Sequence, residues 1–193
     1  MKNLWFKIQV WLEQNCWPIL WLFRRIIYGQ TFRRIPLTRW LFAKVDPRDY
    51  RWLMLYKWCV CWTSKRRRYA VSYSHKGKTG KRVLMHRLII NAPKNLLVDH
   101  YNHNTLDNHR LNLRLASNFQ NQCNVLGKKR KNSLSKYRGV SRNKHSPGWI
   151  ARIQADGKRI KIGTFKKQKA AAHAYDKAAL KYHGQFAMLN FSK

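Results

Sequence analysis

Hydrophobic and polar positions alternate in short runs through the middle and the end of this chain, a pattern typical of β-strands. Turn signals rich in Gly, Lys and Asn separate the runs. In the middle of the chain the strand-like runs cover residues 52–62, 69–74 and 83–90, with a turn over 75–80. Near the end they cover residues 137–142, 149–154 and 159–165, and the turn Ala155-Asp156-Gly157 joins the last two.

The last pattern of the chain has helical spacing. The side chains that recur every three or four positions are mainly small: Ala171, Ala174, Tyr175, Ala178 and Tyr182. Small side chains let a helix lie close against a sheet, and Gly184 is a stop signal. We therefore expect a helix that packs on the strands before it.

The first 44 residues differ from the rest, because they are rich in Trp, Ile and Leu. Their most apolar run, residues 8–23, is interrupted by polar residues and by Pro18, so a transmembrane helix is not expected. A signal peptide is not expected either, because no small-residue cleavage site precedes Arg24 and Arg25. The segment is an apolar and basic extension without an assigned role.

The net charge is the feature of the composition that says most about the binding partner. The chain of 193 residues carries 41 Lys and Arg against 7 Asp and Glu, a formal net charge of +34. So large a positive charge favours a polyanion as the partner, because each neutralised phosphate releases condensed counterions. Nucleic acid is the first candidate. A membrane surface, reached through the N-terminal extension, is the competing polyanion.

Four cysteines are scattered along the chain, and Cys59 and Cys61 are spaced for one face of a strand instead of a zinc knuckle. We expect reduced thiols.

Composition divides the chain into the extension over residues 1–44, a domain over 45–126, a basic linker over 127–135 and a C-terminal domain over 136–193.

The C-terminal domain contains an ordered series of motifs. They are Tyr137-Arg138-Gly139-Val140, Ala151-Arg152-Ile153, Ile162-Gly163-Thr164-Phe165, Ala174-Tyr175-Asp176 and Asn190-Phe191. In this order they resemble the DNA-binding domain of the APETALA2 or ethylene-response-factor type. The resemblance implies a three-stranded antiparallel sheet packed on one helix, with the sheet entering the major groove of DNA.

Lys and Arg occupy the strand positions that would contact DNA in such a sheet. Period-two alternation can place four of them on one face. These are Arg138, Arg152, Arg159 and Lys161, and Arg142 completes the expected DNA-binding set. Lys161 stands where the family often has Trp, and Arg152 where it often has Glu, so the base preference should differ from that of the plant factors. The alternative is that these cations only solvate the sheet.

The middle domain carries a second constellation, within the stretch LVDHYNHNTLDNHRLNLRLASNFQNQCN. Asp99 and His100 are followed there by Asn112 and Asn121. This spacing resembles the HNH homing endonucleases of phages and introns, over residues 45–124. The resemblance implies a small ββα-metal domain (HNH, or His-Me finger) with strands over 98–100 and 113–115, a loop between them and a helix capped by Ser117.

The same resemblance implies a role for each residue. Asp99 and Asn121 would bind one Mg²⁺ or Mn²⁺ ion, to which oxygen ligands are suited. His100 would act as the general base on water, and Asn112 would bridge loop and strand by hydrogen bonds and hold His100 in place. His86 is expected to hold a strand and not to take part in the chemistry.

These features predict an α+β protein that is a site-specific, metal-dependent DNA endonuclease of a mobile element, targeted by its C-terminal domain. The alternative is a non-catalytic DNA-binding transcription regulator. The expected partner is double-stranded DNA, without a membrane partner, and a monomer is an acceptable state. The expected location is the cytoplasm of a bacterial or phage-infected cell, or an organelle, without secretion.

Overall fold

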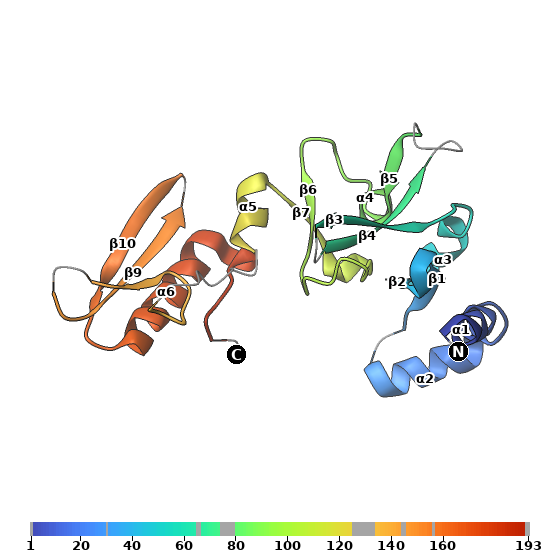
Figure 1. The fold of residues 1–193 in the computed structure, drawn as a ribbon, viewed down its shortest axis with the longest axis horizontal. Helices are drawn as coiled ribbons and strands as arrows, with labels where there is room; N and C mark the ends of the chain where they lie inside the picture. The colour runs from blue at the N-terminus through green and yellow to red at the C-terminus, as the bar shows by residue number, and fades with distance from the viewer. Residues whose placement is uncertain are drawn as a thin grey trace. The chain divides into compact units, whose positions relative to one another are not determined.

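The structure, a computed structural model, describes residues 2–29, 31–64, 67–73, 80–124, 134–143, 146–155 and 157–191. The chain forms two compact units, Met1–Ala116 and Ser117–Lys193 (Figure 1). Both units combine helices with short antiparallel sheets, which confirms the predicted α+β class. The finer prediction of a ββα-metal domain is not shown.

The N-terminal extension forms two helices followed by a β-hairpin. Its elements are α1 (Lys2–Asn15), α2 (Trp17–Tyr28), β1 (Arg33–Pro36), the short helix η1 (Thr38–Trp40) and β2 (Phe42–Val45). Pro18 lies in the first turn of α2, where its missing N–H leaves no hydrogen bond unmade, and Gly29 ends the helix in the left-handed conformation. None of the helices within the described ranges has the length and apolar character needed to cross a membrane.

The rest of the first unit surrounds one hydrophobic core. Its elements are α3 (Pro47–Leu53), β3 (Cys59–Ser64), β4 (Arg67–Tyr73), β5 (Arg82–Leu84), α4 (Met85–Ile89), β6 (Leu97–His100), η2 (Arg110–Asn112) and β7 (Leu113–Ala116). Strands β3, β4 and β5 form a sheet in that order, and β6 pairs with β7. Ile35, Val45, Leu53 and Met85 are almost fully buried together, so one core joins the β1–β2 hairpin to the later elements.

Three of the strands predicted for this unit are confirmed, and two are partly helical. Residues 69–74, 98–100 and 113–115 correspond to β4, β6 and β7. The run 52–62 begins inside α3, which starts at Pro47, and only its second half is strand. The run 83–90 is strand only to Leu84, after which Met85 and Ile89 are buried on one face of α4. The turn predicted over 75–80 falls almost wholly outside the described residues.

The second unit is a three-stranded antiparallel sheet with one long helix on it (Figure 1). Its elements are α5 (Asn118–Cys123), β8 (Val140–Arg142), β9 (Trp149–Ala155), β10 (Lys158–Phe165), α6 (Gln168–His183) and η3 (Gly184–Phe186). Ala171 of α6 packs with Val140, while Tyr175 and Ala179 pack with Ile153. The predicted arrangement of three strands and one helix is therefore confirmed.

The first strand of this sheet is shorter than predicted, because residues 138 and 139 form a turn. Gly139 has a φ of +71°, and a Cβ there would lie 2.0 Å from Cδ2 of Tyr175. The Gly139 carbonyl accepts a hydrogen bond of 2.8 Å from the backbone N–H of Arg152. The turn thus brings the backbone so close to α6 that a side chain does not fit.

The C-terminal segment is tied back to α6 and to this turn. Oδ1 of Asp176 accepts hydrogen bonds from the backbone N and from Nδ2 of Asn190, at 2.9 and 3.0 Å. Oδ2 of Asp176 accepts one from the backbone N of Phe191 at 3.0 Å. Oδ1 of Asn190 in turn accepts one from the backbone N of Arg138 at 2.6 Å. This chain of bonds fixes the turn before β8 relative to the helix.

Helix α5 belongs to the second unit. Ser117 caps it as predicted, through a capping box with Gln120. The ring of Phe119 lies 5.7 Å from the ring of His183 at the end of α6. The division between the two units therefore falls after Ala116, ahead of the boundary at residue 126 expected from composition.

Candidate nucleic-acid interface

The sheet of the second unit has one apolar face and one cationic face. In the register of β9 and β10, Ile153 pairs with Ile160, and both pack with side chains of α6. The next pair, Arg152 and Lys161, therefore points to the opposite face, because side chains alternate along a strand. Arg159, two positions from Lys161, shares that face and is exposed. The surface formed by Arg152, Arg159 and Lys161, called the cationic sheet face below, is the side of the sheet that α6 leaves open.

Arg152 is held in place on the cationic sheet face. Its Nη1 donates a hydrogen bond of 2.9 Å to Oγ of Ser141 on β8, and its side chain is half-buried. A guanidinium has five N–H donors, so most of them remain for an acceptor on a partner molecule. An orientation fixed in this way suits bidentate contact with a base edge or a phosphate.

The two other arginines of the predicted DNA-binding set have different surroundings. Arg142, at the end of β8, is exposed, and its guanidinium carbon lies 5.8 Å from the ring centroid of Trp149. Arg138 precedes β8, is half-buried and hydrogen-bonds the side chain of Tyr175. This corrects the expectation that Arg138 shares a face with Arg152, because period-two alternation holds only inside a strand. Burial raises the pKa of Tyr175, and the charge of Arg138 and its hydrogen bond oppose that shift.

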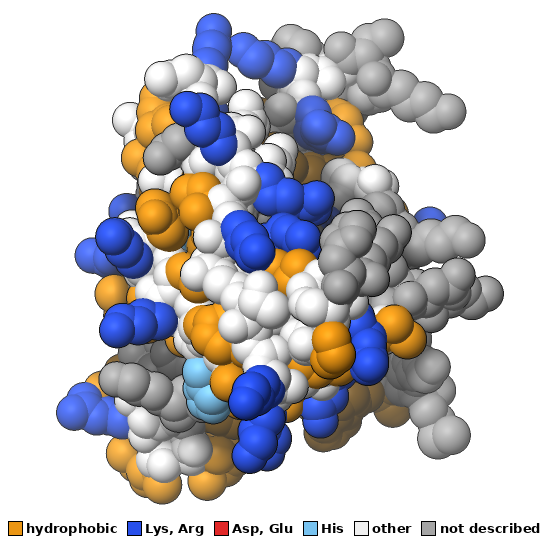
Figure 2. Space-filling model, turned by 90° about the vertical axis from the view of Figure 1, so that its left-hand side faces the viewer, with side chains coloured by type: hydrophobic (Ala, Val, Ile, Leu, Met, Phe, Trp, Pro, Cys, Tyr) orange, Lys and Arg blue, Asp and Glu red, His pale blue; other side chains and the backbone are white. Residues whose placement is uncertain are grey.

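Positive charge extends beyond the cationic sheet face. Lys and Arg side chains are spread over the face of the molecule drawn in Figure 2, where no acidic side chain is visible among the described residues. A field of this sign and size attracts a polyanion from a distance and holds it through phosphate contacts.

In the first unit, Asp99 does not stand ready as a metal ligand. Asp99 and Arg114 are cross-strand partners in β6 and β7, and Nε of Arg114 donates a hydrogen bond of 2.8 Å to Oδ2 of Asp99. The side chains of this ion pair are 8% and 13% exposed. A guanidinium bonded to a carboxylate oxygen opposes the approach of a metal cation to the same oxygen.

His100 lies in a buried group of rings. Its centroid is 5.2 Å from that of His86 and 6.2 Å from that of Tyr69. Its Nε2 lies 3.2 Å from Oδ1 of Asn108, which is fully buried. Burial lowers the pKa of His100, and the hydrogen bond that His100 makes to Oδ1 of Asn108 and the charge of Asp99 oppose that effect without reversing it. The packing therefore favours a neutral imidazole.

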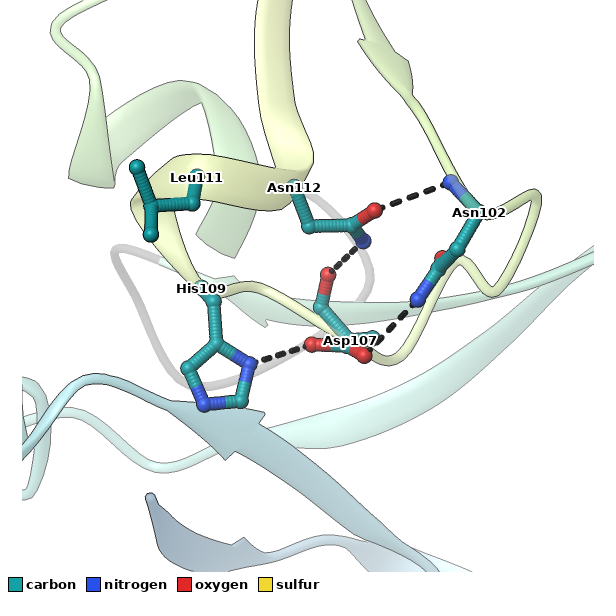
Figure 3. Close-up of a pocket in the computed structure, with 5 residues that line it drawn as sticks. All are labelled: Asn102, Asp107, His109, Leu111 and Asn112. Atoms are coloured by element: carbon teal, nitrogen blue, oxygen red, sulfur yellow. Dashed lines mark hydrogen bonds and ion pairs between the residues drawn. The ribbon is translucent and has the colours of Figure 1, made fainter. Parts of the chain in front are cut away.

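The side chain that hydrogen-bonds His100 is Asn108, whereas Asn112 makes the predicted hydrogen bonds between loop and strand. The Oδ1 of Asn112 accepts a hydrogen bond of 2.9 Å from the backbone N of Asn102, and its Nδ2 donates one of 2.6 Å to the carbonyl of Asp107 (Figure 3). Spacing along the chain does not show which of several asparagines turns inward. The position of Asn108 next to Asp107, within a dense cluster of Asn and His, was the available signal.

A small pocket of about 200 Å³ opens beside this loop (Figure 3). Its lining residues are Asn102, Asp107, His109, Leu111 and Asn112. Oδ1 of Asp107 lies 2.5 Å from Nδ1 of His109, and Oδ2 accepts a hydrogen bond of 2.9 Å from Nδ2 of Asn102. Burial raises the pKa of Asp107, but the hydrogen bonds with His109 and Asn102 and the charges of His109 and Lys44 together outweigh it, and the net shift is downward. These polar side chains bond mainly to one another, so they fix the shape of the loop.

The two predicted metal ligands belong to different units. Asn121 lies in α5 and thus in the second unit, whereas Asp99 belongs to the first. The part of the chain that the structure describes contains no group of three or more His, Cys, Asp or Glu side chains that could hold a metal ion. The Mg²⁺ site of Asp99 and Asn121 stays a prediction from resemblance.

The stability of the first unit should fall as the pH is lowered. Burial, the neighbouring His100 and Arg87 lower the pKa of His86 to about 3. In the unfolded chain His86 takes up a proton near pH 6.5. The stabilisation is therefore complete above about pH 6.5 and is lost toward pH 3, by about 1.4 kcal/mol per pH unit. Urea unfolding at pH 7.5 and 5.0 should show a loss of roughly 2 kcal/mol.

His86→Gln is the matched variant for this effect, because Gln keeps a polar side chain but does not titrate. The comparison uses the pH slope of the free energy of unfolding and not its absolute value. The slope should decrease in the variant. An unchanged slope would show that other groups cause the acid sensitivity.

The comparisons with known proteins concern mainly the second unit. Residues 135–185 match the family model of the AP2 domain. The ethylene-responsive transcription factor WRI1 of Arabidopsis thaliana is 47% identical over 60 residues, which are 30% of this chain and 14% of that protein. The AP2-like ethylene-responsive transcription factor ANT of the same species is 38% identical over 92 residues, 44% of this chain and 17% of that protein. The corresponding factor CRL5 of Oryza sativa subsp. japonica is 38% identical over 93 residues, 45% of this chain and 15% of that protein.

These matches define the class of the second unit. It contains an AP2 DNA-binding domain, as predicted from its motifs. The chain spans only 14–17% of the length of the three relatives, so their properties as whole proteins do not transfer to it directly.

The same findings overturn the prediction of an endonuclease. The matching relatives are named as transcription factors, and nothing in the comparisons supports an HNH nuclease part. The predicted hydrolase of a mobile element is therefore wrong, and the alternative of a DNA-binding regulator agrees better. The roles predicted for His100 and Asn112 in catalysis, and for Asp99 and Asn121 in metal binding, depended on that function and are not carried further.

Proposed function

We propose that this chain is a non-catalytic, sequence-selective DNA-binding protein that acts as a transcription regulator. The AP2 domain of residues 135–185 supports DNA binding, and the names of its plant relatives support a role in transcription. The observation that carries the proposal is the cationic sheet face, on which Arg152 and Lys161 stand opposite each other with Arg159 two positions away.

The sheet would contact DNA with strands β8 to β10 in the major groove. Arg152, oriented by Ser141, is the residue best placed for a bidentate contact with guanine O6 and N7. Arg159 and Lys161 are exposed and can reach either bases or phosphates. Arg142 at the end of β8 would contact the DNA backbone beside the groove.

The place of action that fits this function is the nucleus. The relatives are plant transcription factors, which favours a nuclear protein over the bacterial or phage-infected cytoplasm expected from the sequence. The remainder of the chain brings additional cations, so phosphate contacts by the whole protein should add to those of the sheet.

Selection from a random duplex library tests this proposal. Rounds of binding by the whole chain and amplification of the bound DNA should enrich one short motif that contains guanine at the position read by Arg152. Repeating the selection with Arg152→Gln should relax the preference at that position and leave the others. Recovery of the library without an enriched motif would contradict sequence-selective binding.

A further inference from the structure

Helices α1 and α2 carry most of their large apolar side chains outward. On α2, residues at helical spacing are 54–72% exposed: Ile19, Leu22, Phe23, Ile26 and Ile27. On α1, three more are 57–66% exposed: Leu4, Trp5 and Trp11. These eight side chains are called the apolar hairpin surface below. Single exposed apolar side chains are ordinary, but two helical stripes of them on one pair of helices mark a binding surface.

The contact between the two helices is polar instead. Arg24 of α2 donates to Glu13 of α1 from both of its terminal nitrogens, and their side chains are only 6% and 2% exposed. Arg24 also donates to the carbonyl of Phe32, and Arg33 of β1 donates to the carbonyl of Glu13. A helix pair surrounded by water normally buries its apolar stripe and exposes its charges. This pair has the reverse arrangement.

The orientation of the helices is fixed by their contacts with the β1–β2 hairpin. The ring of Phe6 lies 4.6 Å from Phe42 and 5.3 Å from Trp40. The guanidinium of Arg33 lies 4.5 Å from the ring of Trp17. The side of the helices that faces the core is therefore already occupied, and the apolar hairpin surface is left for another partner.

The positive charge of the chain indicates which kind of partner can bind this surface. A second copy of a chain with a net charge of +34 is repelled, and the polar phosphate backbone of DNA does not suit exposed Ile and Phe side chains. An anionic lipid surface can bind both the apolar side chains and the positive charge, because its acyl region buries apolar side chains and its headgroups bind cations. Lys7 and Arg25 are exposed on the helices to meet such headgroups, and Trp is a residue that favours the membrane interface.

Length and local shape agree with binding in the plane of a membrane. Helices α1 and α2 have 14 and 12 residues, whereas about 20 are needed to cross the hydrocarbon core. A groove of about 320 Å³ lies beside α1, and its walls combine apolar side chains with one cation and one amide: Phe6, Val10, Trp11, Pro36, Lys7 and Gln14. A groove of this kind fits part of an acyl chain with an anionic group at its end.

We propose that the helices α1 and α2 dock this protein on the surface of an anionic phospholipid bilayer. The apolar hairpin surface enters the boundary between headgroups and acyl chains, and Lys7 and Arg25 contact the phosphates. The proposal departs from the expectation that no membrane takes part, and it is independent of the DNA-binding function of the second unit.

Flotation of the whole chain with lipid vesicles tests the docking proposal. The vesicles contain phosphatidylcholine with or without phosphatidylglycerol, and the assay is repeated in about 1 M salt, where the Debye length is about 3 Å. The test variant is Ile19→Gln/Phe23→Gln/Ile26→Gln, which removes exposed apolar side chains without changing the charge. Its partition into phosphatidylglycerol vesicles should be weaker by a factor on the order of 100. The parent should retain part of its binding in high salt.

The matched control is Leu55→Gln/Leu111→Gln, because these side chains are 84% and 98% exposed in the same unit but lie outside the two helices. This control should bind vesicles like the parent, and all three proteins should bind DNA equally. Equal vesicle binding by the triple variant would overturn the proposal, since charge alone would then explain the association. A parent oligomer that the triple variant converts to a monomer would also overturn it, because a second copy would then cover the surface.

Discussion

The substitution Gly139→Ala is expected to unfold the second unit and to abolish its DNA binding. The added Cβ would lie 2.0 Å from the ring of Tyr175 and 2.7 Å from the carbonyl oxygen of Arg152. Both neighbours are held, because Tyr175 is buried under the sheet and the Arg152 N–H is bonded to Gly139 itself. Overpacking combined with a φ of +71° should cost about 3 kcal/mol or more, a large share of the stability of a small domain. Thermal unfolding followed by circular dichroism measures this loss.

The control for this effect is Gly157→Ala. Gly157 also has a positive φ, +74°, but an added Cβ there would meet no heavy atom within 4 Å. Only the backbone strain remains, and it should cost about 1–2 kcal/mol. Similar losses in the two variants would show that the close approach of the Gly139 turn to α6 is not what requires glycine.

Removal of the cationic sheet face is expected to give the second large effect. In Arg152→Ala/Arg159→Ala/Lys161→Ala, the affinity for the selected duplex should fall by about 100-fold or more. Each good side-chain contact with a base edge contributes about 1–3 kcal/mol of discrimination, and the triple variant removes the three best candidates. Fluorescence anisotropy with the selected duplex and with an unrelated duplex measures affinity and selectivity together, and the variant should lose most of the difference between the two.

The control carries the same change of charge on the opposite side of the second unit. Lys169, Lys177 and Lys181 are exposed on α6, so replacing all three by Ala lowers the net charge equally. That control should weaken binding to both duplexes alike, and it should keep the preference for the selected one. Equal loss of selectivity in both triple variants would mean that only the total charge matters and that the sheet is not the reading surface.

The fold of the second unit could be predicted because the alternation along its strands and the small side chains of its helix indicate the same packing. Ile153 and Arg152 alternate on a strand that has one covered and one open face, and small side chains such as Ala171 and Ala179 allow α6 to lie on the covered one. Arg138 was placed on the wrong side because the sequence does not show where a strand begins. The turn at Gly139 sets that point, through its contact with a helix that follows much later in the chain.

The first unit was less predictable, because the orientation of its side chains depends on contacts with residues that are distant in the sequence. The stripe from Ile19 to Ile27 is visible in the sequence, but its outward orientation depends on tertiary contacts, which are those of the helices with the β1–β2 hairpin and the ion pair of Arg24 with Glu13. Likewise, a metal site of Asp99 and Asn121 was implied only by the resemblance to HNH endonucleases. The spacing could not show that the strand register places Arg114 against Asp99, or that Asn121 belongs to the other unit.

The measurement that tests the central claim most directly is the state of the DNA recovered from the library selection when Mg²⁺ is present. A non-catalytic DNA-binding protein predicts bound duplexes of full length that share one motif. Sequencing of the recovered molecules, ends included, reads the motif and the integrity of both strands in a single experiment. New ends at a fixed distance from the motif, produced by the parent protein and lost with its binding, would contradict the account.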